Sequence, residues 1–309
     1  IRDAQESRGR GDVYKRQIMA KQKYAVIGHP IGHTMSPFIH KRLFSLSGID
    51  AEYSVYDIPP EELEKKFKEE LQYLNGFNIT IPHKQGIIPL IDELDPKAKL
   101  YGSVNTVFND NGTHKGYTTD PDGFLKALES ADIPFSGRVV ILGCGGVART
   151  MAYEAVLADN DLTLAVRKDD VNMANDLKKE LESIKETEVK VCLLDELSGE
   201  IDVLVNATPV GMFPKVDSCP VNDEIIKNSK AVFDAIYNPL ETQLVQKAKA
   251  FGNKAIGGMA MLVWQAVVAQ QKWNDVTFNK DDINKLCIDC LEELSLIHIS
   301  EPTRLLSIS

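Results

Sequence analysis

Hydrophobic and polar residues in the first third of the chain follow the pattern of mixed strands and helices. Short apolar runs predict strands at Lys23–Ile27, Ala51–Tyr56 and Gly76–Ile81. Apolar residues at spacings of four, four and three predict an amphipathic helix over Pro60–Leu74. The turn cluster Asn109–Gly112 stands between two further strand patterns, so it predicts a hairpin.

From Arg138 onward, strands and helices alternate regularly. Arg138–Leu142 (RVVIL) is a continuous apolar run, as in a parallel strand that is covered on both faces. Further strands are expected at Leu162–Val166, Val189–Leu194, Asp202–Asn206 and Ala231–Ile236. This alternation predicts an α/β fold with a doubly wound parallel sheet. Two final helices, near Met259–Trp273 and Asp281–Leu294, have no evident place in that sheet.

Composition narrows the class of protein. The 309 residues are 43% hydrophobic and 26% charged, which fits an ordinary globular chain of two domains. The net charge of −10 gives no global attraction to nucleic acid or anionic membranes. The longest apolar run, near Met259–Ala269, is too short to span a bilayer. Five cysteines, an odd number, indicate free thiols in a reducing compartment, so we expect a cytoplasmic protein.

Neither end of the chain shows a periodic pattern. Residues 1–18 and 295–309 resemble translated adapter sequence, so we expect a non-native leader over 1–18 and a non-native tail over 295–309. Naturally disordered termini are the alternative. The fold is then expected to extend from Met19 to Leu294.

A glycine-rich turn follows the strand Arg138–Leu142 and opens a helix. It fits the pattern G-x-G-x-x-A with Gly143, Cys144, Gly145, Gly146, Val147 and Ala148. The first glycine permits the tight turn, the second lets backbone approach a pyrophosphate, and the alanine allows close packing of helix on strand. The context predicts a dinucleotide site, and a tight turn without a ligand is the alternative.

Arg167 and Lys168 follow the second strand of this unit, where an NAD site usually has an acidic residue for the ribose hydroxyl. Two cations there suit a 2′-phosphate, so we expect NADP(H) as the cofactor. A solvated charge pair is the alternative. Asp169 and Asp170 lie close by and would weaken the anion site.

Eight segments resemble the motifs of the shikimate dehydrogenase family in order and spacing. They are GHPIGHTMSPFIH (28–40), FNITIPHK (77–84), SVNT (103–106), GYTTDPDGF (116–124), GCGGVAR (143–149), NATPVGM (206–212), DAIYNP (234–239) and GGMAMLVWQA (257–266). The resemblance implies reversible, NADPH-dependent reduction of 3-dehydroshikimate to shikimate, in the biosynthesis of chorismate and aromatic amino acids. It implies an N-terminal α/β substrate domain (19–121), a Rossmann-like cofactor domain (122–257) and C-terminal helices (258–294) that return to the substrate domain.

Lys84 follows a predicted strand and Pro82, so we expect it on a loop at the sheet edge where open α/β sheets place their sites. A lysine can donate a proton to oxygen as a ketone becomes an alcohol. The resemblance places Asp120 in contact with Lys84 and with a substrate hydroxyl. For any single lysine, solvated surface is the alternative.

Thr34 and Ser36 stand at a predicted helix start, with Ser36 as the N-cap, Pro37 as the first helical residue and Gly48 as the stop. Two hydroxyls and the helix dipole suit a carboxylate, although Ser36 as a plain N-cap explains the pattern equally well. The resemblance assigns substrate contact to Thr80, Asn105, Tyr237 and Gln265 as well, and nicotinamide contact to Ala235 and Gly258. Asn78 is expected to support its loop.

Other features favour plainer interpretations. Cys287 and Cys290 form a single CxxC on a predicted helix and suit apolar packing, and His29, His33 and His40 lack a carboxylate at ligand spacing, so we expect no metal.

Three departures from the family pattern soften the expected preference for NADP: Thr118, Val166 and Val171 replace two asparagines and an arginine. A quinate/shikimate dehydrogenase that accepts NAD is one alternative, and a non-catalytic metabolite sensor on the same scaffold is the other. The expected partner is a small molecule, with no nucleic acid and no membrane, and a homodimer is possible.

Overall fold

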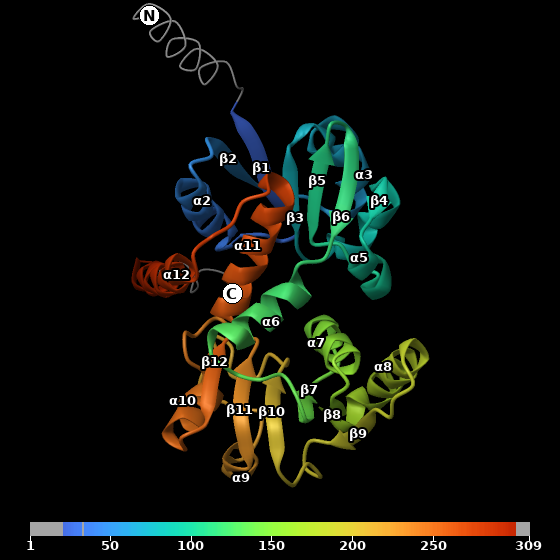
Figure 1. The fold of residues 1–309 in the computed structure, drawn as a ribbon, viewed down its shortest axis with the longest axis vertical. Helices are drawn as coiled ribbons and strands as arrows, with labels where there is room; N and C mark the ends of the chain where they lie inside the picture. The colour runs from blue at the N-terminus through green and yellow to red at the C-terminus, as the bar shows by residue number, and fades with distance from the viewer. Residues whose placement is uncertain (1–20, 33, 301–309) are drawn as a thin grey trace, which may run out of the picture.

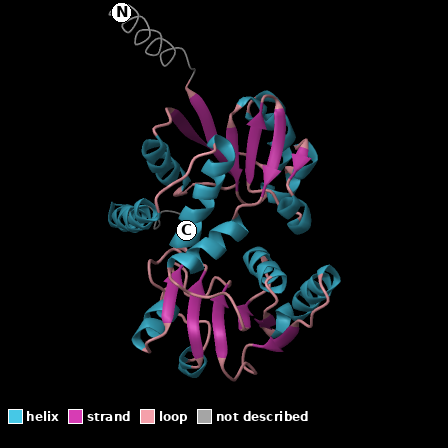
Figure 2. Ribbon diagram, in the orientation of Figure 1, coloured by secondary structure: helices cyan, strands magenta, loops and turns pink. Residues whose placement is uncertain are grey.

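The computed structural model describes residues 21–32 and 34–300, with side chains to residue 294 (Figure 1). Two six-stranded sheets lie at opposite ends of the molecule, and the helices α6 (Asp120–Ser130) and α11 (Met259–Asn274) lie between them (Figures 1 and 2). The predicted leader (1–18) and the end of the predicted tail (301–309) lie outside the described residues. The predicted α/β class with two domains is confirmed.

The first sheet has the strand order β2-β1-β3-β5-β6-β4. Its strands are β1 (Gln22–Gly28), β2 (Ala51–Asp57), β3 (Gly76–Ile79), β4 (Glu93–Leu94), β5 (Thr106–Asp110) and β6 (Thr113–Tyr117). β1 pairs in parallel with β2 and β3, whereas β3, β5 and β6 are antiparallel neighbours. The β5–β6 hairpin turns through Asn111 and Gly112, both at positive φ (53° and 96°), as in a two-residue hairpin turn.

Short helices surround this sheet. They are α2 (Ser36–Ser47), α3 (Leu63–Glu69) between the 3₁₀ turns η1 (Pro60–Glu62) and η2 (Leu71–Tyr73), α4 (His83–Gly86), η3 (Ile88–Leu90) and α5 (Pro96–Tyr101). α2 ends at Gly48 in the left-handed region (φ 69°), as predicted. The prediction of a single helix over Pro60–Leu74 is wrong, because the backbone at Glu70 is not helical (φ −134°). Leu71 and Leu74 still belong to the same hydrophobic core as Leu63. The backbone of this segment is therefore determined by the burial of these side chains and not by a continuous helix.

The second sheet is fully parallel, with the order β12-β11-β10-β7-β8-β9. Its strands are β7 (Arg138–Leu142), β8 (Asp161–Val166), β9 (Lys190–Leu193), β10 (Ile201–Asn206), β11 (Ser229–Asp234) and β12 (Lys254–Gly257). Alternate residues of β7 enter two separate cores, Val139 and Ile141 on one face and Val140 and Leu142 on the other. The sheet is therefore covered on both faces, which confirms the doubly wound prediction.

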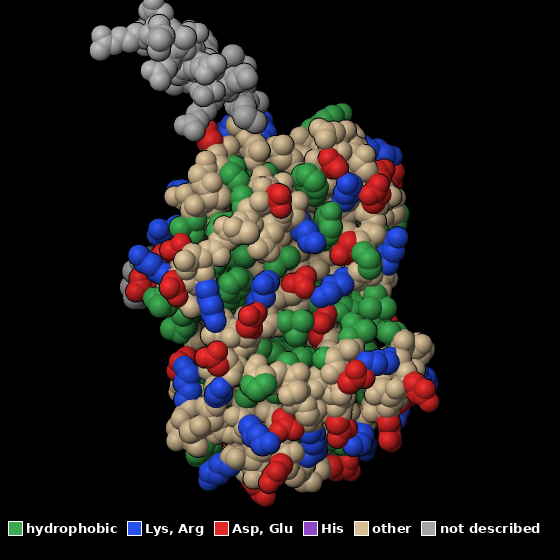
Figure 3. Space-filling view, in the orientation of Figure 1, with side chains coloured by type: hydrophobic (Ala, Val, Ile, Leu, Met, Phe, Trp, Pro, Cys, Tyr) green, Lys and Arg blue, Asp and Glu red, His purple; other side chains and the backbone are tan. Residues whose placement is uncertain are grey.

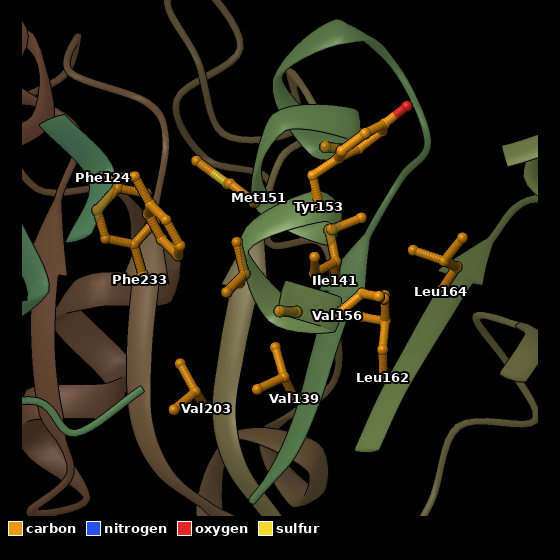
Figure 4. Close-up of a cluster of buried hydrophobic side chains, with 14 of the residues drawn as sticks. Phe124, Val139, Ile141, Met151, Tyr153, Val156, Leu162, Leu164, Val203 and Phe233 are labelled. Atoms are coloured by element: carbon orange, nitrogen blue, oxygen red, sulfur yellow. The ribbon is translucent and has the colours of Figure 1, made fainter. Parts of the chain in front are cut away.

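Helices follow most of these strands. They are α7 (Gly146–Leu157), η4 (Lys168–Asp170), α8 (Val171–Ile184), α9 (Asp223–Lys227) and α10 (Gln243–Ala250). Figure 4 shows how α7 covers one face of the sheet, with Met151, Tyr153 and Val156 over Ile141 and Leu162. β12 was not predicted, and its strand geometry comes from pairing with β11.

The last two helices leave the second sheet and return to the first domain, as expected. α11 begins directly after β12, and its Trp273 donates a hydrogen bond to the carbonyl of Val107 in β5 (2.8 Å) and stacks on Tyr24 of β1. α12 (Lys280–Ser300) joins α11 and α2 in one apolar cluster that contains Ile283, Leu286 and Cys290. Cys290 is buried there, so the apolar interpretation of the CxxC pair holds. α12 continues six residues past the predicted boundary at Leu294.

Membrane spans, metal ligands and cysteine pairing concern the described part of the chain alone. None of its helices combines the length and apolar character needed to cross a membrane. None of its His, Cys, Asp and Glu side chains gather in a group that could hold a metal ion. All five cysteines are free.

Candidate active site

Lys84 and Asp120 form the centre of the site. The Lys84 ammonium group donates a hydrogen bond of 2.6 Å to Oδ2 of Asp120, and the two side chains are 31% and 21% exposed. Asp120 is the first residue of α6, the helix between the two sheets (Figure 1). Lys84 was expected on a loop, but it lies in the one-turn helix α4, whose backbone is held by a hydrogen bond from Val104 N–H to the Lys84 carbonyl (2.8 Å). The pair is therefore fixed on two rigid elements and remains open to a ligand.

Asn105 joins this pair to α11. Its amide nitrogen lies 2.9 Å from Oδ1 of Asp120 and 3.3 Å from Oε1 of Gln265. Its amide oxygen accepts a hydrogen bond from the backbone N–H of Thr119 (2.8 Å). Since each end of the amide is engaged, Asn105 holds Asp120 and Gln265 in a fixed relation. Four of the predicted site residues, Lys84, Asp120, Asn105 and Gln265, are thus brought into one hydrogen-bonded cluster.

Thr34 and Ser36 lie at the start of α2. The Thr34 hydroxyl donates to Oγ of Ser36 (3.1 Å) and accepts from its backbone N–H (3.2 Å). The prediction that Ser36 is the N-cap is wrong by one residue: Met35 occupies that position without a capping hydrogen bond from its side chain, and Ser36 is the first helical residue. The Ser36 hydroxyl is consequently not used for capping, and two hydroxyls face a helix N-terminus, which favours an anion.

Tyr53 is a site residue that sequence reasoning missed. Its hydroxyl donates to Oδ1 of Asn78 (2.7 Å) and interacts with the side chain of Ser36. Burial raises the pKa of Tyr53 well above its usual value, and the Ser36 interaction only partly offsets this, so the hydroxyl stays protonated. The sequence carried no signal for it, because Tyr53 is an ordinary aromatic residue in the strand pattern of β2.

A chain of hydrogen bonds continues from Tyr53 to the Lys84–Asp120 pair. The amide nitrogen of Asn78 donates to Oγ1 of Thr106 (3.1 Å), and that hydroxyl donates to Oδ1 of Asn105 (3.1 Å). Asn78, which sequence analysis assigned to loop support, therefore connects the hydroxyls at α2 with the carboxylate of Asp120. Thr119 is a second missed residue: its hydroxyl lies 3.1 Å from the Asn105 amide nitrogen.

The described histidines of the first domain have structural partners. His40 stacks on Tyr53 at 4.4 Å, and burial lowers its pKa to about 3, so it is neutral. His29 lies 2.8 Å from the carboxylate of Asp57. His33 lies outside the described residues. Thr80 follows β3, and its methyl group would clash with a Cβ on Gly28, so β1 and β3 approach closely beside the site.

The predicted glycine turn is tight and leaves the start of α7 open. Gly143 has a positive φ of 96°, and Gly145 directly precedes α7. A Cβ on Gly145 or Gly146 would meet no described atom within 4 Å, so the space above the turn is open. No described side chain caps α7, so its first N–H groups remain available, whereas Ala148 is fully buried against the sheet. Val147 is exposed.

Arg167 and Lys168 lie beyond the end of β8, next to this turn. Arg167 is 75% exposed and forms an ion pair with Asp170, three residues later. The backbone carbonyl of Asp170 accepts a hydrogen bond from Sγ of Cys144 (3.7 Å), which ties this segment to the glycine turn. Lys168 is exposed. The two predicted cations are therefore placed beside the predicted pyrophosphate site, although Arg167 already has an anionic neighbour.

The loop after β11 carries Ala235 and Tyr237. A Cβ on Gly258 would overlap the carbonyl of Ala235, so the backbone approach there requires glycine. Asp234 organises the loop, since it accepts hydrogen bonds from the Asn206 amide (3.0 Å) and the Thr242 hydroxyl (2.6 Å). Burial raises the pKa of Asp234 to about 6. Tyr237 is 38% exposed and makes no hydrogen bond to the Lys84 cluster among the described residues. Figure 3 shows apolar side chains gathered across the middle of the molecule, between the two domains.

A doubly wound domain with an open glycine turn, joined to a domain that carries a lysine–carboxylate pair, defines a two-domain dinucleotide-dependent oxidoreductase. Comparisons with known proteins agree with this class. The family model described as "Shikimate dehydrogenase substrate binding domain" matches residues 26–107. The chain is 39% identical to the shikimate dehydrogenase (NADP(+)) of Methanocaldococcus jannaschii over 284 residues, which cover 88% of this chain and 98% of that protein.

Solved structures show the same likeness. A crystal structure of a shikimate dehydrogenase in complex with NADP+ superposes with a TM-score of 0.80 at 36% identity, covering 88% of this chain and 96% of that one. The Thermus thermophilus enzyme, in complex with NADP(H) and shikimate, superposes with a TM-score of 0.78 at 31% identity, covering 87% and 100%. The chain belongs to the shikimate dehydrogenase family.

Proposed function

We propose that this protein catalyses the reversible, NADPH-dependent reduction of 3-dehydroshikimate to shikimate. The observation that carries the proposal is the 2.6 Å contact between Lys84 and Asp120, held in place by Asn105 and Gln265. Family membership supplies the substrate class, because the relatives named above are shikimate dehydrogenases. An assembled proton donor also argues against a non-catalytic sensor, which would need none.

Lys84 acts as the general acid in the reduction and as the general base in the reverse direction. The chemistry that bound NADPH supplies is a hydride for the carbonyl carbon of the substrate. When the carbonyl is reduced, its oxygen would take a proton from Nζ of Lys84, which would leave the lysine as a neutral amine beside Asp120. Lys84 is 31% exposed, so water can return the proton. Proton transfer of this kind contributes about 10²- to 10⁴-fold to rate.

The remaining polar residues orient the substrate. Thr34 and Ser36 bind its carboxylate at the start of α2, where the helix dipole adds to two hydroxyl donors. Thr80, Asn105 and Gln265 bind its hydroxyl groups, and Asp120 accepts a hydrogen bond from a further hydroxyl. Tyr237 reaches the substrate from the cofactor domain, and its partial exposure supports this role.

The cofactor would lie along the carboxyl edge of the second sheet. Gly143, Cys144, Gly145, Gly146, Val147 and Ala148 hold the pyrophosphate, which the open space above the turn and the uncapped start of α7 support. Arg167 and Lys168 would bind the 2′-phosphate. Ala235 and Gly258, whose backbones approach closely, would line the nicotinamide.

The proposal also includes domain boundaries and a cell compartment. Residues 19–121 with the helices of 258–294 form the substrate domain, and residues 122–257 form the cofactor domain. Five free cysteines support a cytoplasmic location. The partner is a small molecule, nucleic acid has no role, and a homodimer is compatible with the fold.

The test is the loss of NADPH absorbance after 3-dehydroshikimate is added to the purified protein, with NADH and, in the reverse direction, quinate in parallel. We expect fast loss with NADPH. Lys84→Met should lower kcat by about 10²-fold or more while NADP+ binding is kept. The matched control is Lys99→Met, an exposed lysine of α5, which should leave kcat unchanged. No turnover by folded protein, or normal turnover by Lys84→Met, would contradict the proposal.

A further inference from the structure

The guanidinium group of Arg167, the predicted ligand of the 2′-phosphate, is already engaged. Its Nε and Nη2 atoms lie 2.9 Å and 2.8 Å from the same oxygen, Oδ2 of Asp170. Arg167 is 75% exposed, whereas Asp170 is only 25% exposed and stands at the start of α8. The carboxylate is thus the better fixed member of the pair, and the guanidinium is drawn towards it.

This pair lies where the adenosine ribose of a dinucleotide would be bound. The backbone of Asp170 contacts Cys144 of the glycine turn (3.7 Å), and Arg167 directly follows β8, the strand next to β7. A phosphate on the ribose would meet both the cation and the carboxylate. Because Asp170 cannot donate a hydrogen bond when ionised, any contact between it and a phosphate is repulsive.

The segment that follows β8 carries no net charge. The segment 167–170 contains two cations, Arg167 and Lys168, and two anions, Asp169 and Asp170, so its formal charge is zero. The next residue, Val171, adds no charge. Selectivity for NADP over NAD requires an excess of positive charge or of donors at this point, and Asp170 removes part of what Arg167 offers.

We propose that Asp170 is a specificity-determining residue, whose carboxylate competes with the 2′-phosphate for Arg167 and lowers the preference for NADP(H) over NAD(H). The inference rests on the proposed function, since it needs Arg167 at the cofactor. Exposed ion pairs contribute about 0.2–1 kcal/mol, which corresponds to a change of about 1.4- to 5-fold in affinity. Asp170 is therefore a modulator of the cofactor ratio and not an absolute barrier.

The experiment is calorimetric titration of NADP+ and NAD+ into wild type, Asp170→Asn and Asp169→Asn. Asp169→Asn removes the same charge at an exposed residue one position away, so it is the matched control. We expect Asp170→Asn to lower the Kd of NADP+ by about 1.4- to 5-fold and to change that of NAD+ by less than half as much. Asp169→Asn should have less than half of this effect.

Three outcomes would overturn the inference. Weaker NADP+ binding by Asp170→Asn would mean that the carboxylate orients Arg167 for the phosphate. An equal fall in the Kd of NADP+ in Asp170→Asn and Asp169→Asn would mean that any negative charge nearby has the same electrostatic effect. An equal fall in the Kd of NADP+ and of NAD+ would mean that the 2′-phosphate is not involved. In an Arg167→Ala background, Asp170→Asn should improve NADP+ binding by less than it does with Arg167 present, because only the direct repulsion of the phosphate is left to relieve. If wild type binds neither dinucleotide, the proposed function itself fails, and that result is distinct from a wrong sign in Asp170→Asn.

Discussion

The close approach between α6 and α11 offers a sharp test of how the site is held. Gly123 of α6 faces α11, and a Cβ atom there would lie 2.8 Å from the Met261 carbonyl oxygen and 2.8 Å from Cβ of Gln265. Separations below 3.0 Å between such atoms do not persist, so Gly123→Ala must push the helices apart. Because two of the nearest three atoms belong to the α11 backbone, the displacement moves Gln265 itself.

The expected magnitude follows from two opposing effects. Overpacking in a well-packed interface costs about 1–3 kcal/mol. Replacing glycine by alanine within a helix returns up to about 1 kcal/mol. We expect a net loss of about 1–2 kcal/mol and a Tm lower by a few degrees. Gln265 lies 3.3 Å from the Asn105 amide, near the limit of a hydrogen bond, so a shift of several tenths of an ångström breaks it and lowers kcat/KM by about tenfold.

Thermal melting and steady-state kinetics with 3-dehydroshikimate measure both effects. Gly86→Ala is the matched control, since it is also a helical glycine but its Cβ would meet only Leu63 Cδ2 at 3.5 Å, an ordinary contact. Wild-type Tm and kcat/KM in Gly123→Ala would refute the packing argument. A lower Tm with unchanged kinetics would refute the positioning of Gln265 by this contact.

Two further predictions concern buried polar groups. Tyr53→Phe leaves Oδ1 of Asn78 without its donor and should cost about 1–3 kcal/mol and raise the KM for 3-dehydroshikimate, whereas Tyr56→Phe in the same strand should change neither. Asp234 has a folded-state pKa of about 6, above its usual 3.8, so its contribution to stability is full below about pH 4 and is lost as pH rises through 6. Unfolding measured across about pH 4–7 should therefore show wild type losing up to about 3 kcal/mol relative to Asp234→Asn, and parallel curves would contradict this.

The elements that could be predicted from sequence are those whose local pattern and tertiary environment agree. β7 has the predicted bounds, Arg138–Leu142, because four consecutive fully buried residues read as one apolar run. The end of α2 at Gly48 is also as predicted, because a glycine in the left-handed conformation is a local signal that ends a helix. Errors arose where tertiary contacts decide. The segment Pro60–Leu74 buries the predicted apolar residues but breaks its helix at Glu70 to do so.

The site shows the same division between what is local and what is not. Lys84, Asn105 and Asp120 could be predicted from sequence motifs, because each is a polar residue within a characteristic segment. No motif predicts a role for Tyr53, because its contacts with Asn78, 25 residues away in sequence, and with Ser36 form only in the folded chain. The role of Thr119 likewise depends on Asn105. Residues that act by holding others are visible only when the chain is folded.

Ser36 shows why this distinction matters for mechanism. As an N-cap its hydroxyl would be consumed by the helix, and the same sequence would then support a purely structural role. The structure instead places Met35 at the cap, so the hydroxyl of Ser36 is left to Thr34 and Tyr53. The hydrogen bonds that run from Tyr53 through Asn78 and Thr106 to Asn105 then connect this hydroxyl with Asp120. A shift of one residue in the start of a helix thus places the hydroxyl of a predicted capping serine on the same hydrogen-bond network as Asp120.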